Sequence, residues 1–267
     1  IGSTTLTSAN VSYNINGTIA TKAWTGSLAT CATDTVVFTG AQQYNFAGGF
    51  TMKAYTDGPN GATDVNVTND TLYSGGCMGM AGNYTIDPAG SGPSNYTTFA
   101  AAVAAMQVCG IGGPVKFQVA AATYNEQVSV PNIPGANATN TITFDGGNGN
   151  KATRIISFSP IGAPNWHVVR FDGCNYVTFR NLTIQSTSGS GAWVTHFFDG
   201  SNNRINNCNI NLTGNSIGSS NFIGAVINGN KTNWNTNTAV GDNHLMDSNV
   251  FNLNGAYYGI TTSASGG

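Results

Sequence analysis

The sequence predicts an all-β protein in which an N-terminal antiparallel β-sandwich is followed by a right-handed parallel β-helix with an N-terminal α-helical cap. Three observations support this fold class. Residues 1–76 contain short alternating runs separated by turn residues, residues 77–113 contain one helical pattern, and residues 114–267 carry a near-repeat. We therefore expect a sandwich at 1–76 that lacks its first strand, a junction with a capping helix at 77–113, and β-helical coils at 114–267 that continue beyond the chain.

The sandwich is predicted from four strand-like runs that end at Gly, Asn or Asp. They read TSANVSYNI, TDTVVFTG, GGFTMKAYT and NDTLYSG. The pieces SYNINGTIATKAWTGSLA and GGFTMKAYTDGPNGATDVNVTNDTL resemble immunoglobulin-like modules, of the CARDB or fibronectin type III kind, from secreted surface proteins of Bacteroidetes. A further strand normally begins such modules. Its absence would leave an open sheet edge, which we expect a neighbouring domain or subunit to fill.

The helical pattern lies between Ser94 and Gly110. Ser94 or Asn95 is expected to cap its start, Gly110 to end it, and one face to carry Phe99, Val103 and Met106. We interpret this helix as a cover for the exposed end of the first coil. Glu126, in a turn soon after, is expected to act as a capping or salt-bridging residue rather than as a catalytic acid.

The near-repeat is an apolar residue, Asp or Asn, and Gly, at FDGG, FDGC, FDGS and INGN. These begin at Phe144, Phe171, Phe198 and Ile227, and a step of about 27 residues matches one coil of a β-helix. Gly after Asp or Asn suits a tight corner, so the triplet is interpreted as one corner per coil. The alternative is a Ca²⁺ site formed by three stacked carboxylates, Asp145, Asp172 and Asp199, with Asn228 as a neutral fourth member.

Aligning the runs that follow each triplet predicts two inward-facing columns. One column contains Phe179, Ile205 and Met246, and the other contains Ile184, Ile210 and Phe251. The three histidines, in contrast, do not share a repeat position, which argues against a common metal site at His167, His196 and His244.

The composition excludes several classes of partner. Only 7% of the 267 residues are charged, against about 25% in typical soluble proteins, and the formal net charge is −2. We therefore expect no nucleic-acid partner, and no apolar run is long enough to span a membrane. The chain begins within a strand-like run and ends without a stop, so we expect it to be part of a longer secreted polypeptide with further domains.

Five cysteines, without CxxC or Cys/His spacing, give no indication of zinc. Cys77 and Cys109 flank the expected helix and are the preferred disulfide pair. Cys174 and Cys208 lie in strand-like runs and are expected to be buried as small apolar side chains. The triplets DTV and DTL resemble a Bacteroidetes O-glycosylation signal, which implies sugar on Thr35 and Thr71.

The stretch SNYTTFAAAVAAM, GPVKFQVAAATYNEQVSVP and NTITFDGG resembles the entry of the pectin-lyase-like β-helix superfamily, nearest to pectin methylesterases, over about residues 78–150. The resemblance implies a β-helix but not the activity. The esterase motifs QDTLY and DFIFG and the polygalacturonase motifs NTDG and GHG are absent from the coils. A lyase that uses Arg170 or Arg180 beside Asp172 stays open as an alternative.

The expected function is therefore a non-catalytic adhesin, or a structural stalk or fibre module, of a bacterial surface protein of the type IX secretion kind. We expect it to be extracellular and attached to the outer membrane, without a cofactor other than Ca²⁺. Partners would be a glycan or surface ligand, or further copies joined through an open strand edge or coil end. The alternatives are a polysaccharide-active lyase or esterase and a carbohydrate-binding module. In the adhesin, Trp166, Trp193 and Trp234 are the expected aromatic carbohydrate contacts.

Overall fold

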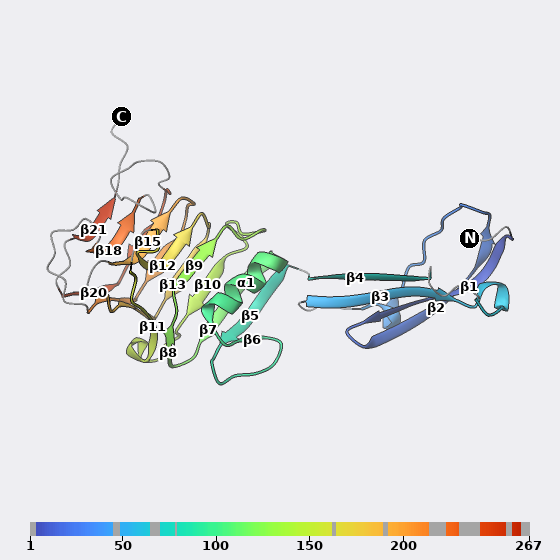
Figure 1. Ribbon diagram of the computed structural model, residues 1–267, viewed down its shortest axis with the longest axis horizontal. Coiled ribbons are helices and arrows are strands. Elements are labelled where there is room, and N and C mark those ends of the chain that lie inside the picture. The colour runs from blue at the N-terminus through green and yellow to red at the C-terminus, as the bar shows by residue number, and fades with distance from the viewer. Residues whose placement is uncertain are drawn as a thin grey trace, which may run out of the picture. The chain divides into compact units, whose positions relative to one another are not determined.

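The computed structural model describes residues 4–44, 49–64, 70–77, 79–161, 164–188, 192–213, 223–229, 241–254 and 258–262. The chain divides into two compact units, Ile1–Met78 and Gly79–Gly267 (Figure 1). Most of the segment expected to be a junction and capping helix, residues 77–113, belongs to the second unit, where it forms strands and a helix.

The first unit is built on one antiparallel sheet, sheet A, in the order β2-β1-β3-β4. These strands are β2 (Thr18–Leu28), β1 (Leu6–Ile15), β3 (Gly49–Asp57) and β4 (Thr71–Cys77). The β1–β2 hairpin turns at Asn16 and Gly17, which have φ of 49° and 87°, as a two-residue loop between twisted strands requires. Short 3-10 helices lie at η1 (Gly40–Gln42) and η2 (Pro59–Gly61).

The predicted run TDTVVFTG, residues 33–40, contains no strand. It belongs instead to a segment that packs on sheet A: the ring of Phe38 lies 4.9 Å from that of Tyr13, and the Tyr13 hydroxyl donates to the carbonyl of Gln42. The described residues of this unit therefore form a single sheet covered in part by irregular chain, and the predicted two-sheet sandwich is wrong.

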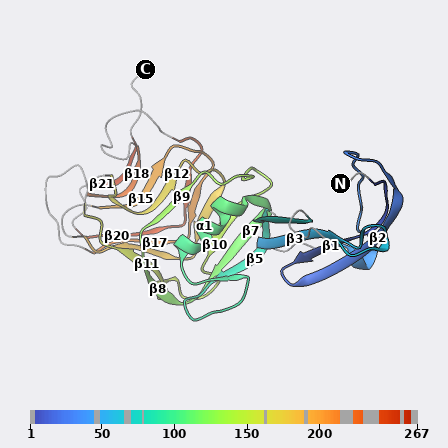
Figure 2. The same ribbon diagram turned by 45° about the vertical axis from the view of Figure 1, so that its right-hand side comes forward.

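The second unit is a three-sheet body of parallel strands, in which the chain visits sheets B, C and D in turn (Figures 1 and 2). We call one passage through the three sheets a circuit. Sheet B contains β19 (Leu245–Asp247), β16 (Arg204–Asn206), β13 (Val177–Arg180), β10 (Ile142–Asp145), β7 (Ile111–Val119), β5 (Met80–Ile86) and β6 (Asn95–Tyr96). Sheet C contains β20 (Val250–Leu253), β17 (Asn209–Leu212), β14 (Thr183–Ser186), β11 (Arg154–Phe158) and β8 (Ala122–Asn125). Sheet D contains β21 (Tyr258–Thr262), β18 (Ile223–Asn228), β15 (Ala192–Phe198), β12 (His167–Asp172) and β9 (Val128–Pro131).

The core of the body consists of equivalent side chains from successive circuits. Phe117, Phe144 and Phe179 pair in register, with ring centroids 5.1 and 4.6 Å apart. This column continues through Ile205 and Met246, and the neighbouring column joins Ile184 to Ile210 and Phe251. Both predicted columns are confirmed. Parallel pairing alone brings these side chains together, because the residues of a column are far apart in sequence.

The helix α1 (Phe99–Cys109) belongs to the same core. Its capping residue is Thr98, whose side chain accepts from the Ala101 amide, so the predicted caps Ser94 and Asn95 are wrong. Glu126 confirms its expected role: its two carboxylate oxygens accept from the amides of Phe99 and Ala100, both at 2.9 Å. A carboxylate at this end also complements the helix dipole.

The all-β fold class is therefore wrong as predicted. The chain is of a mixed α/β type: three parallel sheets and a helix share one core, and an antiparallel sheet precedes them. The helix buries Phe99 completely against Tyr124 and Phe144, so it is an integral part of the core. It has 11 residues, and no described helix is long and apolar enough to cross a membrane.

The FDG triplets do not mark one corner per circuit. Phe144 and Asp145 lie in sheet B, whereas Phe171 and Asp172 lie in sheet D. The third triplet is one residue out of register, because Asp172 pairs with Phe198 rather than with Asp199. The first step of 27 residues therefore connects positions in different sheets, and the second connects neighbouring strands of sheet D one residue out of register. A fixed step does not count circuits, because the connecting loops differ in length.

The residues 77–109 are closed into a loop by a disulfide. Cys77 and Cys109 are disulfide-bonded, whereas Cys31, Cys174 and Cys208 are free thiols. The closed segment contains β5, β6 and α1. The disulfide therefore encloses the first two strands and the helix of the three-sheet body.

Replacing both Cys77 and Cys109 by Ser should lower the free energy of unfolding by about 3–4 kcal/mol, because the loop of about thirty residues is no longer closed in the unfolded chain. Urea unfolding followed by circular dichroism measures this loss. The matched control is Cys31→Ser, which removes an exposed free thiol and should change stability by less than about 0.5 kcal/mol. Equal stability of the double variant and the control would contradict the prediction.

Candidate functional site

The three aspartates of the predicted Ca²⁺ site occupy different places. Asp145 ends β10 in sheet B, Asp172 ends β12 in sheet D, and Asp199 follows β15 in a left-handed conformation with φ of 55°. Within the described part of the chain, no group of three or more His, Cys, Asp or Glu side chains could hold a metal ion. The structure therefore does not bring these carboxylates together.

Asp145 is the centre of a neutralised cluster on the outer side of sheet B. Its side chain is 3% exposed and contacts the Lys116 ammonium at 2.9 Å and the Arg180 guanidinium at 2.7 Å. The Asn181 side chain and the Gly147 amide also donate to it, each at 2.7 Å. Burial alone would raise the pKa of Asp145, but the hydrogen bonds from these donors outweigh it and hold the pKa well below its usual range.

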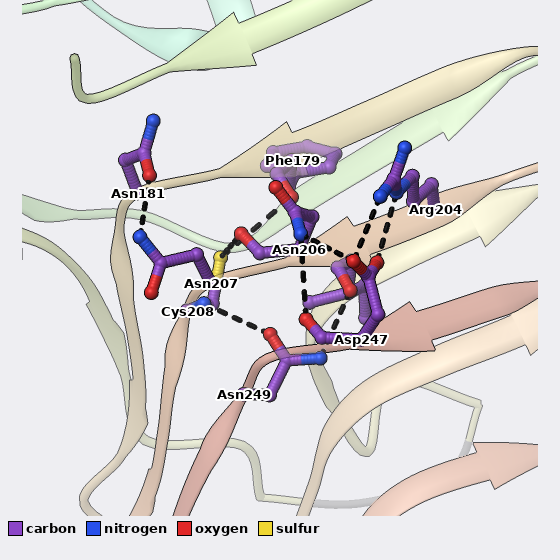
Figure 3. Close-up of polar contacts among 9 residues, drawn as sticks. Phe179, Asn181, Arg204, Asn206, Asn207, Cys208, Asp247 and Asn249 are labelled. Atoms are coloured by element: carbon purple, nitrogen blue, oxygen red, sulfur yellow. Dashed lines mark hydrogen bonds and ion pairs between the residues drawn. The ribbon is translucent and has the colours of Figure 1, made fainter. Parts of the chain in front are cut away.

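A second charged cluster continues along sheet B, one strand beyond Arg180 (Figure 3). The Arg204 guanidinium binds Asp247 through two hydrogen bonds of 2.9 and 2.7 Å, and the Asn206 side chain donates to the same carboxylate at 2.7 Å. Asparagines at the adjoining corner contact each other, with Asn207 donating to Asn181 at 2.8 Å. The outer side of this sheet is therefore a regular array of paired charges and amides.

On sheet D, a partly buried chain of hydrogen bonds runs through four side chains. Arg170 contacts Asp172 at 3.0 Å and the Nδ1 of His167 at 3.2 Å, and the Nε2 of His167 lies 2.8 Å from the Ser129 hydroxyl. A guanidinium can only donate, so Nδ1 must accept and the ring proton lies on Nε2. His167 thus donates to Ser129 and cannot remove its proton as a general base.

Arg170 and Arg180 were the candidate lyase bases, and only Arg170 lies beside Asp172. Burial lowers the pKa of Arg170, and the contact with Asp172 opposes this shift only in part. The side chain is also held by the Pro164 carbonyl at 3.1 Å. Arg180 instead contacts Asp145, 2.7 Å away.

The two predicted glycan-contacting tryptophans that the structure describes, Trp166 and Trp193, do not form a surface platform. Trp193 is fully buried, and its ring lies edge-on to that of His196 at 4.7 Å, so its assignment as a contact residue is wrong. Trp166 is half-buried and accepts the Trp193 amide with its backbone carbonyl. Trp234 lies outside the described residues.

Each unit has an open cleft. One, of about 570 Å³, lies at the corner between sheets D and B, and its lining residues include Asn132, Asn175, Asp199, Ser201 and Asp242. Asp199 therefore faces a groove with a second carboxylate, which the sequence pattern did not indicate because Asp242 lies in a long and irregular circuit. The other, of about 1010 Å³, lies in the first unit beside Lys53, Asp57, Asp64 and Thr71.

The remaining predicted sites differ in exposure. Thr35 is exposed and lies outside any strand, whereas Thr71 begins β4 and is half-buried, so both glycosylation sites stay predictions. Cys174 and Cys208 are fully buried, as expected. Burial raises the pKa of Cys208 to about 12, and that of Cys174 also rises. Neither thiol is therefore a nucleophile near neutral pH.

Comparison with known proteins does not identify the chain: no family model, no curated protein and no solved structure matches it.

Replacing Asp145 by Asn should lower the free energy of unfolding at pH 7 by about 2 kcal/mol, because a buried carboxylate contacts two cations. Since its folded pKa is depressed, this contribution is present above pH 4 and is lost as pH falls below 4. Urea unfolding between pH 2.5 and 7 tests both effects. Asp247→Asn is the control, because Asp247 is 34% exposed, and it should cost less stability than Asp145→Asn.

Protonation of His244 should lower the stability of the three-sheet body in acid. Its ring stacks on Phe197 at 4.3 Å, and neither ring nitrogen has a hydrogen-bond partner among the described residues. Burial lowers its pKa to about 4. The stability that the neutral ring supports is thus complete above pH 6.5 and falls as pH drops from 6.5 towards 4, by at most about 3 kcal/mol.

The variant His244→Phe should remove part of this acid sensitivity, because a phenyl ring does not titrate. Urea unfolding at pH 7 and pH 4.5 should show a smaller loss of stability for the variant than for the native chain. Identical losses for the two proteins would show that His244 is not a source of the effect.

Proposed function

We propose that the chain is a non-catalytic extracellular module of a secreted bacterial surface protein and that it serves adhesion or structural support. The main support is the state of its ionisable side chains. Asp145, Asp172 and Asp247 each contact a cation, and Glu126 caps a helix. A general acid or base must face the substrate and change its protonation state, which these structural contacts oppose.

The architecture also supports a mechanical role. In the three-sheet body, successive circuits are joined by parallel backbone hydrogen bonds and a continuous column of side chains. The disulfide supports a location in an oxidising compartment outside the cytoplasm, where disulfides persist. Few charges and many amides and hydroxyls on the surface suit contact with the hydroxyl groups of a glycan. Attachment to the outer membrane and type IX secretion belong to this proposal through the sequence resemblance alone.

One observation favours the alternative function, a polysaccharide-active enzyme. Asp199 and Asp242 are exposed and line the same groove, and two carboxylates that face one substrate can act as acid and base or nucleophile. Among the described residues that line this groove there is no histidine, lysine or arginine. We therefore propose that the groove binds rather than cleaves, with Asn132 and Asp242 as ligand contacts.

Incubation with acidic and neutral polysaccharides, with and without Ca²⁺, should release neither reducing ends nor unsaturated products. Retention of the chain on an immobilised glycan array should instead reveal binding, which Asn132→Ala and Asp242→Asn should weaken about two- to fivefold. The matched control is Asp57→Asn, in the first unit. Turnover that is lost in Asp199→Asn, Asp242→Asn or Arg170→Ala would overturn the proposal in favour of the enzyme.

A further inference from the structure

Strand β4 is an unprotected edge of sheet A. In the described part of the chain it pairs with β3 alone, in an antiparallel register from Thr71 opposite Tyr55 to Cys77 opposite Gly49. Its sequence, TLYSGGC, contains no charged residue and no proline. Leu72 is 64% exposed and Tyr73 is 74% exposed. Sheet edges usually carry charges, prolines or bulges that discourage pairing with another chain.

The opposite edge of the sheet, β2, is protected by the same chain. Lys22 provides a charge, and its ammonium donates to the Val37 carbonyl at 2.7 Å. Gln42 donates to the Thr21 carbonyl at 2.7 Å, and Trp24 donates to Asp34 at 2.6 Å. The segment that follows β2 is thus bound to it. The two edges of one sheet differ, and only β4 lacks this protection among the described residues.

The sequence of β4 is complementary to itself about Ser74. Leu72 and Tyr73 precede this residue, and Gly75 and Gly76 follow it. If two copies pair antiparallel with Ser74 opposite Ser74, then Tyr73 lies opposite Gly75 and Leu72 opposite Gly76. Each large side chain therefore faces a residue without a side chain, which allows it to cover the backbone of the neighbouring strand.

Within one copy, a large side chain of β3 already lies opposite a glycine of β4. Phe50 lies opposite Gly76 on β3, and a Cβ placed on Gly76 would lie 3.4 Å from its ring. Since Leu72 and Gly76 share a face of the strand, Leu72 of a second copy would lie beside Gly76 on the face that Phe50 covers. An apolar contact between Leu72 and Phe50 would then bridge the seam.

We propose that two copies of this chain join edge to edge through β4, in an antiparallel pair with its two-fold axis at Ser74. This makes one continuous sheet from two copies of sheet A. The contact is isologous, so it closes after two copies. It goes beyond the proposed function and does not depend on it, because every residue involved lies in the first unit. A strand pair is a small interface, so the dimer belongs to the weak, concentration-dependent class.

Cross-linking of the full chain tests the pairing and its register. In a Cys31→Ser background, Ser74→Cys should give a disulfide-linked dimer under mild oxidation, because opposite residues of an antiparallel pair lie about 4.5–5.5 Å apart. The matched control is Ser27→Cys, exposed on β2, which should stay monomeric. Equal cross-linking of the two variants would overturn the proposed symmetric pairing. A disulfide that joins one variant to the other when the two are mixed would overturn it as well, because it would show that β4 pairs with β2.

Sedimentation velocity over a range of concentrations tests the association without cross-links. The native chain should show a reversible dimer, and Tyr73→Lys should weaken it at least about tenfold, because two like charges would meet near the axis. Thr25→Lys, on β2, is the matched control and should leave the dimer unchanged. Circular dichroism melts should show that both variants are folded. A native chain that sediments as a monomer at every concentration would refute the proposal.

Discussion

Parallel pairing between successive circuits is the constraint on which the three-sheet body depends. It places Phe117, Phe144 and Phe179 in one column although other strands separate them in sequence. It also fixes the outward positions, so that Asp145 pairs with Arg180 across neighbouring strands. A slip of one residue would turn the aromatic column outward and the charges inward. The same register therefore determines the core and the surface.

The turns between strands can stack because glycine lies where the backbones of consecutive circuits come closest. A Cβ on Gly146 would collide with the carbonyl oxygen of Asn181, and one on Gly200 would collide with that of Cys174. Both contacts join consecutive circuits, so the need for glycine comes from the stacking of circuits. Asn181 and Asn207 take left-handed conformations at their own corner, with φ of 59° and 49°. Asparagine accepts this conformation more readily than most residues and can also bond its neighbour.

The two units use polar residues in different ways. On sheets B and D of the body, the charged side chains of Asp145, Asp172 and Asp247 each contact a cation, and this neutralisation permits them to lie on a parallel sheet. In the first unit, one edge of sheet A is held by its own chain, through Lys22 and Gln42, and no described strand pairs with the other edge. The amides and hydroxyls of the body and the free edge of the described sheet A are the features on which the proposed structural or adhesive role and the proposed pairing depend.

The sequence alone determined the local features: the strands of residues 6–15 and 49–57, the helix of residues 99–109, and the inward columns through Phe179 and Ile184. The strands and the helix depend on a periodicity of a few residues, which a sequence displays directly, whereas the columns came from aligning the runs that follow the triplets. Only the tertiary structure decided which of the other distant positions are neighbours. It separated Asp145 from Asp172, buried Trp193, and brought Asp199 beside Asp242 in one groove. The circuits vary in length with their loops, so a fixed step along the chain such as the FDG spacing cannot identify neighbours that backbone hydrogen bonding between strands selects.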